Sequence, residues 1–278
     1  MPLDSVADFD KSVGVAALIS ERAKHLHEEI EQLQTSALEL KDRLQNAEMP
    51  QVIVEGPTDV TILNRVYELL YPDQQAMCEF ISAASASKVV SFVLGMSDLG
   101  RDYAFPITGL LDDDHEGRSQ FNSSKQRSYR LLTDTGLRVV NRVRGIYLGF
   151  LPKPTWVQEA EARLSENGVN SQLPVTIETL VSKGFMVAAV DNQRIEFRDE
   201  STTAKNANFS VPINLSNELG RHLDEGDRYL VKKVDEQSKV RFSQYFQRNA
   251  TAEDCEAFKA IFEWLETTIR VFREAREE

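Results

Sequence analysis

Two stretches of the sequence place acidic residues directly after an apolar run. In VIVEGPTD the run ends at Glu55, and a Gly-Pro pair leads on to Asp59. In ITGLLDDDHEG a second run ends at Asp112 and Asp114. Several carboxylates brought to one place repel each other and are costly to desolvate. A hard divalent cation with oxygen ligands, Mg²⁺ or Mn²⁺, resolves this, so the pattern predicts a metal site.

The apolar runs are predicted to be strands of an α/β fold with a mostly parallel sheet flanked by helices. Strands are expected at 51–54, 78–81, 106–111 and near 146–151, with helices at 59–70, 87–96, within 119–133 and near 156–166. Ligands of such sheets bind beyond the carboxyl ends of the strands, where Glu55, Asp112 and Asp114 would meet. Gly56 and Gly117 would allow tight turns and the close approach of a phosphate-bearing ligand.

A long helix is predicted ahead of the sheet, from about Val15 to Gln45. Its apolar residues alternate spacings of four and three: Ile19, Ala23, Leu26, Ile30, Leu33, Ala37, Leu40 and Leu44. This heptad pattern is typical of a coiled coil, which would form a homodimer or dock a partner helix. The alternative is a long helix packed on its own domain. The expected organisation is a helix over 1–48, an α/β core over 49–183 and an extension over 184–278.

The extension is predicted to contain a β-hairpin and two helices. The hairpin is expected in FMVAAVDNQRIEFRD, with its turn at Asp191-Asn192. Residues 199–217 are polar and expected to be a loop. Helices are expected from Asp235 to Arg248 and from Thr251 onward, the second with an apolar stripe that suits a core or an interface.

Composition limits the class of protein. The chain has 278 residues, two cysteines and four histidines, so a disulfide framework, a zinc cluster or a histidine-rich metal site is not expected. No apolar window is long enough to span a membrane, and no secretory signal is visible at the N-terminus, which predicts a cytoplasmic protein.

Charge is distributed unevenly along the chain. The net charge of −12 argues against a passive nucleic-acid coat protein. One segment is nevertheless basic, and we expect it either to follow a phosphate backbone or to form solvated helix faces. Its basic residues are Arg118, Lys125, Arg127, Arg130, Arg138, Arg142 and Arg144.

The order of these motifs resembles the Toprim domain, shared by topoisomerases, bacterial-type primases, recombination mediator proteins and the OLD family of nucleases. The resemblance covers roughly residues 50–150 and implies that Glu55, Asp112 and Asp114 are the metal ligands of a nuclease. Resemblance to the OLD branch adds Asp59 and Glu178 as further ligands of a two-metal site. It also adds a catalytic lysine, with Lys239 as the first candidate and Lys205 and Lys233 as alternatives.

The family pattern differs here in one respect. OLD proteins usually carry an ATPase domain ahead of the Toprim domain, but this sequence has no GxxxxGK[ST] motif. The chain therefore resembles a stand-alone Toprim effector, such as the Toprim subunit of PARIS-type phage-defence systems. That resemblance implies a Mg²⁺- or Mn²⁺-dependent endonuclease acting on DNA or RNA, with tRNA as one candidate substrate. It also implies anti-phage defence controlled by a separate ATPase partner.

The expected reaction is hydrolysis of a phosphodiester, with Lys239 neutralising the phosphoryl oxygens. His115, next to the DxD, is either a proton carrier or an exposed loop residue. The main alternative is a catalytically silent Toprim module that binds a partner or nucleic acid. Phosphatases of the haloacid dehalogenase type and receiver domains carry their acids after an earlier strand, and a complete primase or topoisomerase is longer.

Overall fold

The computed structural model describes residues 20–25, 27, 35, 38, 42, 47–98, 103–123, 129–132, 135–140, 145–169, 172–198, 220–231 and 233–277. The chain forms two compact units, residues 1–46 and 47–278. Every described residue of the first unit is helical, and seven of the eight predicted heptad positions lie outside the described residues. Among the helices that the structure describes, none is long and apolar enough to cross a membrane.

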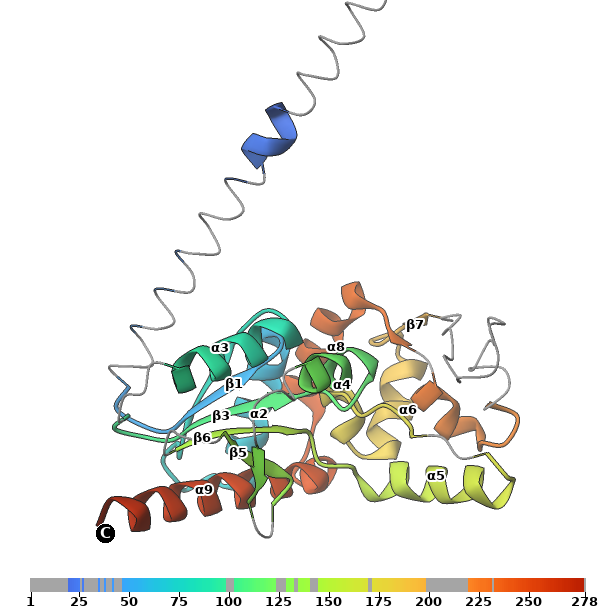
Figure 1. The fold of residues 1–278 in the computed structure, drawn as a ribbon. Coiled ribbons are helices and arrows are strands. Elements are labelled where there is room, and N and C mark those ends of the chain that lie inside the picture. Colours follow the sequence, from blue (N-terminus) through green and yellow to red (C-terminus); the bar gives the residue numbers. More distant parts are fainter. Residues whose placement is uncertain are drawn as a thin grey trace, which may run out of the picture. The chain divides into compact units, whose positions relative to one another are not determined.

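The second unit is built on a sheet that has six strands in the described part of the chain (Figure 1). They are β1 (Gln51–Val54), β2 (Glu79–Ser82), β3 (Ile107–Leu111), β4 (Tyr129–Leu131), β5 (Leu137–Val140) and β6 (Ile146–Phe150). Their order across the sheet is β2-β1-β3-β6-β5-β4. The first four strands in this order are parallel, and β5 runs antiparallel to both of its neighbours. The predicted mostly parallel α/β sheet is thus confirmed.

Strands β1 and β3 are neighbours at the centre of the parallel part. Gln51 pairs with Ile107, so the two strands end side by side at the same edge of the sheet. Every residue of both strands is buried, which explains their continuous apolar sequence. The residues that follow these strands, Glu55 and Asp112, therefore leave the sheet next to each other.

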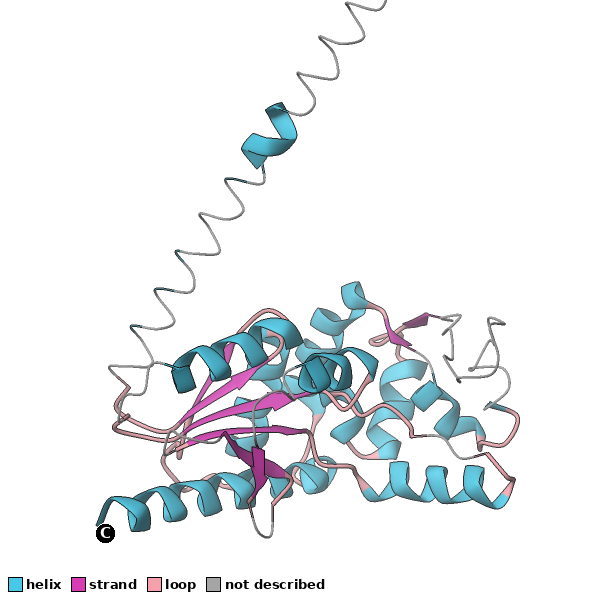
Figure 2. Cartoon of the chain, viewed as in Figure 1, coloured by secondary structure: helices cyan, strands magenta, loops and turns pink. Residues whose placement is uncertain are grey.

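Helices cover both faces of the sheet (Figure 2). The helices between the strands are α2 (Pro57–Leu70), α3 (Ala86–Asp98), α4 (His115–Ser123) and α5 (Thr155–Glu166). Helix α3 packs on one face, where a Cβ added to Gly109 would lie 2.7 Å from Val93. On the other face Val52 lies in one buried cluster with Ile62 of α2 and Phe262 of α9 (Lys259–Glu277). The central strands of the sheet are therefore covered by helices on both sides.

The remaining elements follow the last strand. They are η1 (Ile177–Leu180), α6 (Lys183–Asp191), β7 (Phe197–Arg198), η2 (Glu225–Val231), β8 (Lys233–Val234), α8 (Glu236–Asn249) and η3 (Glu253–Phe258), which leads into α9. Strands β7 and β8 form a separate antiparallel pair. The stripe predicted on the last helix is largely core, since Ile261, Phe262 and Leu265 are buried.

The hairpin predicted after Gly184 is wrong. Residues 183–191 form helix α6, whose first turn is capped by the Ser182 hydroxyl accepting from the Phe185 N–H at 3.1 Å. Phe185, Met186 and Ala189 are buried at helical spacing. A short apolar run is compatible with either a strand or a helix, and here the cap and the helix-favouring Met and Ala residues decide.

The helix predicted within 119–133 is confirmed only over 119–123, as the end of α4. Helix α4 ends at Ser123, and β4 and β5 then add an antiparallel pair to the edge of the sheet. Gly136 lies between them, and a Cβ added there would be 2.6 Å from the Trp264 ring. Packing on α9 therefore favours this pair over a continued helix.

Candidate active site

Glu55 and the DxD turn meet at the carboxyl edge of the sheet. The Asp112 backbone N–H donates to Oε1 of Glu55 at 2.8 Å, across 57 residues of sequence. This hydrogen bond joins the residue after β1 to the residue after β3. The Ser82 hydroxyl, at the end of β2, lies 3.5 Å from the Glu55 carbonyl oxygen. Three neighbouring strands thus contribute to this edge, as expected for the ligand-binding end of a parallel sheet.

Asp59 lies in the first turn of α2 and is buried, with 8% of its surface exposed. Its Oδ2 accepts the Gly56 N–H at 2.7 Å, which is the N-capping role that its position suggests. The turn through Gly56 and Pro57 reverses the chain, so that Asp59 lies near Asp112. Asp59 therefore caps α2 and also belongs to the acidic cluster, by which we mean Glu55, Asp59, Asp112, Asp114 and Glu178.

The DxD turn separates its three carboxylates. Oδ1 of Asp114 caps α4 by accepting the Gly117 N–H at 2.8 Å. Asp113 instead forms an ion pair with Arg118, at 2.5 Å. Gly117 leaves no room for a side chain, since an added Cβ would be 2.1 Å from the Asp112 carbonyl oxygen. The glycine thus brings the first turn of α4 onto the Asp112 backbone.

Glu178 reaches the same edge from a distant part of the chain. A two-way backbone bridge joins Asp113 and Val175, with N–H···O distances of 2.8 and 3.1 Å. It places the start of η1 beside the DxD turn. Glu178 is only 1% exposed, and neither of its carboxylate oxygens has a hydrogen-bond partner. A buried carboxylate without a partner is costly and indicates a cation or water that binds there.

Lys239 lies on α8, which packs against α2. Burial lowers the pKa of Lys239, but the negative charges of Glu178 and Asp112 outweigh that effect and raise it above its usual value. Its ammonium also lies 3.4 Å from Glu236. Lys239 is therefore a fixed positive charge beside the acidic cluster.

The carboxylates act on one another electrostatically. Burial raises the pKa of Glu55 to about 7, and the Asp114 charge adds to the rise. Burial also raises the pKa of Asp59 to about 7, and the charge of Glu178 acts in the same direction. The pKa of Asp112 is raised well above its usual range by burial and by the charges of Asp59 and Glu55. A divalent cation would relieve this repulsion.

The donor set fits a hard cation. It consists of carboxylate oxygens, which suit Mg²⁺ and Mn²⁺, and it includes the unpartnered Glu178. No three acidic, histidine or cysteine side chains in the described ranges are already arranged so that they could hold a metal ion. The hydrogen bonds given above use Oε1 of Glu55, Oδ2 of Asp59 and Oδ1 of Asp114. Each of these oxygens has a further lone pair, so the side chains can keep these hydrogen bonds and also bind a cation.

The predicted basic run is not assembled as a surface by the described residues. Arg118 is engaged within the protein by Asp113. Arg138, on β5, stacks its guanidinium 4.7 Å from the centre of the Phe121 ring. The other members lie where no side chain is described: Lys125, Arg127, Arg130, Arg142 and Arg144.

The remaining candidate site residues lie outside the acidic cluster or have no described side chain. His115 is exposed at the start of α4. Lys205 lies outside the described residues, and Lys233 is in β8 without a described side chain. Glu116, which the sequence reasoning did not select, adds to the rise in the Glu55 pKa. Its place in DDDHEG, two residues after the DxD, is the sequence signal for it.

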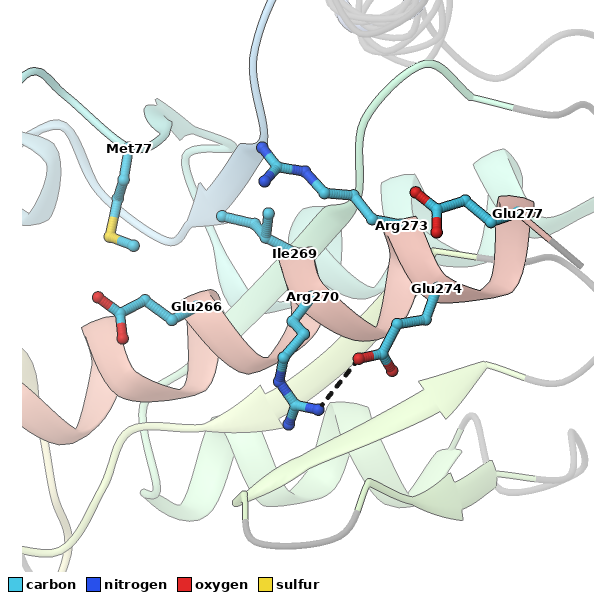
Figure 3. A pocket seen from close by; sticks show the side chains of 7 residues that line it. All are labelled: Met77, Glu266, Ile269, Arg270, Arg273, Glu274 and Glu277. Atoms are coloured by element: carbon cyan, nitrogen blue, oxygen red, sulfur yellow. Dashed lines mark hydrogen bonds and ion pairs between the residues drawn. The ribbon is translucent and has the colours of Figure 1, made fainter.

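Two surface pockets lie along α9, away from the acidic cluster. The larger measures about 380 Å³ and is lined by Met77, Glu266, Ile269, Arg270, Arg273, Glu274 and Glu277 (Figure 3). Arg270 and Glu274, one turn apart on α9, form an ion pair at 3.4 Å. The second, of about 200 Å³, shares Ile269, Arg273 and Glu277 with the first. The charges lining both are mixed in sign, so neither resembles a catalytic cluster.

Comparison of the sequence and the structure with known proteins gives no match to a family model, to a curated protein or to a solved structure.

Proposed function

We propose that residues 47–278 form a Toprim-like nuclease domain that uses Mg²⁺ or Mn²⁺ to hydrolyse phosphodiesters. The observation that supports it most is the meeting of Glu55, Asp112 and Glu178, from three separate segments, at the carboxyl edge of a parallel sheet. A structural role alone does not account for a buried Glu178 with two unpartnered oxygens. The order of the motifs along the chain adds the resemblance described above.

Each residue of the cluster has a role in this proposal. Glu55, Asp112 and Asp114 would hold one ion, and Asp59 and Glu178 would help to hold a second. When bound, the cation supplies Lewis acidity toward the phosphoryl oxygens and a nucleophile at neutral pH. The charges of Glu55 and Glu178 both act on Asp112, which therefore lies within the electrostatic reach of both carboxylates.

Lys239 would stabilise charge in the reaction. Hydrolysis joins a water oxygen to phosphorus and breaks the opposite P–O bond, while negative charge accumulates on the phosphoryl oxygens. The raised pKa of Lys239 keeps its proton in place at neutral pH. A fixed, partly buried ammonium stabilises such charge without reorganising.

The test is a cleavage assay with the full chain on supercoiled plasmid and on total tRNA. Wild type, Asp112→Asn and Lys239→Gln are compared in Mg²⁺, Mn²⁺ and EDTA, with Asp73→Asn, an exposed turn residue, as the control. We expect metal-dependent cutting by wild type and Asp73→Asn and a loss of at least a hundredfold in both site variants. Undiminished cutting by Asp112→Asn would refute the site.

The alternative function, a silent binding module, gives a different result in the same experiment. It predicts no cutting of either substrate by wild type, with binding of plasmid or tRNA unaffected by Asp112→Asn. Calorimetry with Mn²⁺ then separates the two proposals, because a silent module does not require the metal. An effector restrained by its partner would still bind Mn²⁺.

The resemblance further implies a separate ATPase partner and anti-phage defence. Co-expression with a candidate ATPase, followed by plaque counts, tests this. Protection that requires both chains and is lost with Asp112→Asn is the expected result. Equal protection by Asp112→Asn would show that defence does not require cleavage.

A further inference from the structure

Arg118, on the first turns of α4, contacts two segments that each contribute carboxylates to the site. Its Nε forms the ion pair with Oδ1 of Asp113, at 2.5 Å. Its second guanidinium nitrogen donates to the Asp113 carbonyl oxygen at 2.8 Å and to the Leu173 carbonyl oxygen at 3.3 Å. One side chain therefore joins the DxD turn to the chain that leads into η1.

The segment around Leu173 is fixed from its other side as well. The Leu173 N–H donates to Oε1 of Glu161 on α5 at 2.7 Å. Lys153 contacts both oxygens of the same Glu161, at 2.7 and 2.9 Å. Two residues further on, Val175 forms the backbone bridge to Asp113. The peptide at 173 is thus held between α4 and α5, close to Glu178.

We propose that Arg118 is a positioning residue that sets the separation between the DxD turn and Glu178. The inference rests on the proposed function, since it concerns the ligands of that metal site. A guanidinium is planar and presents its donors in a fixed geometry, so it can hold two segments at one spacing. Its Nε and one of its two terminal nitrogens are used within the protein, so positioning is an alternative to the predicted role of Arg118 in contacting a phosphate backbone.

Mn²⁺ affinity, measured by calorimetry on the full chain without nucleic acid, tests the positioning role. We expect Arg118→Gln to weaken binding by roughly 10- to 100-fold, as is usual when a partner of the ligand shell is lost. Arg118→Lys keeps the positive charge but cannot reach both segments, so it should also weaken Mn²⁺ binding. Hydrogen exchange should become faster at the Val175 amide in both variants, because that N–H donates to Asp113.

Arg270→Gln is the matched control. Arg270 is an exposed arginine of α9 with a single ion pair to Glu274, and its loss should leave Mn²⁺ affinity unchanged. Thermal unfolding of each variant shows whether it folds. If Arg118→Gln does not fold, Arg118→Lys decides.

Three results would overturn the inference. Wild-type Mn²⁺ affinity in Arg118→Lys would show that charge alone is required. Unchanged Mn²⁺ affinity in Arg118→Gln, together with weaker binding to plasmid or tRNA, would restore the phosphate-contact role and leave the proposed function intact. A wild-type chain that neither binds Mn²⁺ nor cuts would overturn both proposals.

Discussion

At the scale of single residues, Glu178 is expected to bind the metal ion and to lower the stability of the metal-free chain. It is buried, and both oxygens lack a hydrogen-bond partner. We expect Glu178→Met, which is similar in size and apolar, to raise the unfolding free energy of the metal-free chain by about 1–2 kcal/mol. The same change should remove most of the Mn²⁺ affinity. Urea unfolding in EDTA and calorimetry measure the two effects.

The control for this change is Glu166→Met, at the exposed end of α5. It should alter neither stability nor affinity by a measurable amount. A lower unfolding free energy in Glu178→Met would show that the attraction between Glu178 and Lys239 outweighs the cost of burying the Glu178 carboxylate.

The acidic residues should also make stability depend on pH. In the folded, metal-free chain Glu55 and Asp59 keep their protons up to about pH 7, whereas in the unfolded chain they release them near pH 4. The folded state binds more protons in this window, so the unfolding free energy falls as pH rises through it. We expect Glu55→Gln to reduce that fall by about 1–2 kcal/mol, after allowance for solvent screening.

Urea unfolding in EDTA across this window measures the slope. Saturating Mg²⁺ should reverse it, because the ion binds deprotonated carboxylates and so stabilises the folded chain more as pH rises. An identical slope in wild type and Glu55→Gln would contradict the raised pKa of Glu55.

At the scale of secondary-structure elements, the first turn of α4 depends on the small size of Gly117. Gly117→Ala would place a Cβ 2.1 Å from the Asp112 carbonyl oxygen, so the turn must move. We expect the change to lower the unfolding free energy by about 1–3 kcal/mol and to weaken Mn²⁺ binding without removing a ligand. Gly95→Ala, in the middle of α3 with open space around it, should instead raise stability by about 0.5–1 kcal/mol. Equal effects of the two substitutions would show that Gly117 is not required for close packing.

How far the sequence predicts these elements depends on how local their determinants are. Strands β1 and β3 are buried apolar runs that end in distinctive turns, so their positions and the meeting of Glu55 with Asp112 could be expected. The run at 185–190 is as compatible with a strand as with a helix, and the Ser182 cap decides. The position of Glu178 beside the DxD turn depends on the backbone bridge between Asp113 and Val175. Such non-local pairing has no short-range signal, and only the resemblance suggested that residue.

For the whole molecule, the division at residue 46 gives a prediction about folding and assembly. Residues 47–278 form their own compact unit with its own core. A chain without residues 1–46 should therefore keep its melting temperature and lose only the helical circular dichroism of the removed segment. If the heptad helix dimerises the protein, the truncated chain should be monomeric in light scattering where the full chain is dimeric. The same oligomeric state in both would refute dimerisation through this helix.

The order in which the site residues occur along the chain has a consequence for protein synthesis. On the proposed function, the site draws its ligands from Glu55 through Glu178 and its lysine from Lys239. A ribosome releases the chain from the N-terminus, so Lys239 emerges after every carboxylate of the cluster. A nascent chain that ends before Lys239 would lack that positive charge and would not be able to cleave nucleic acid.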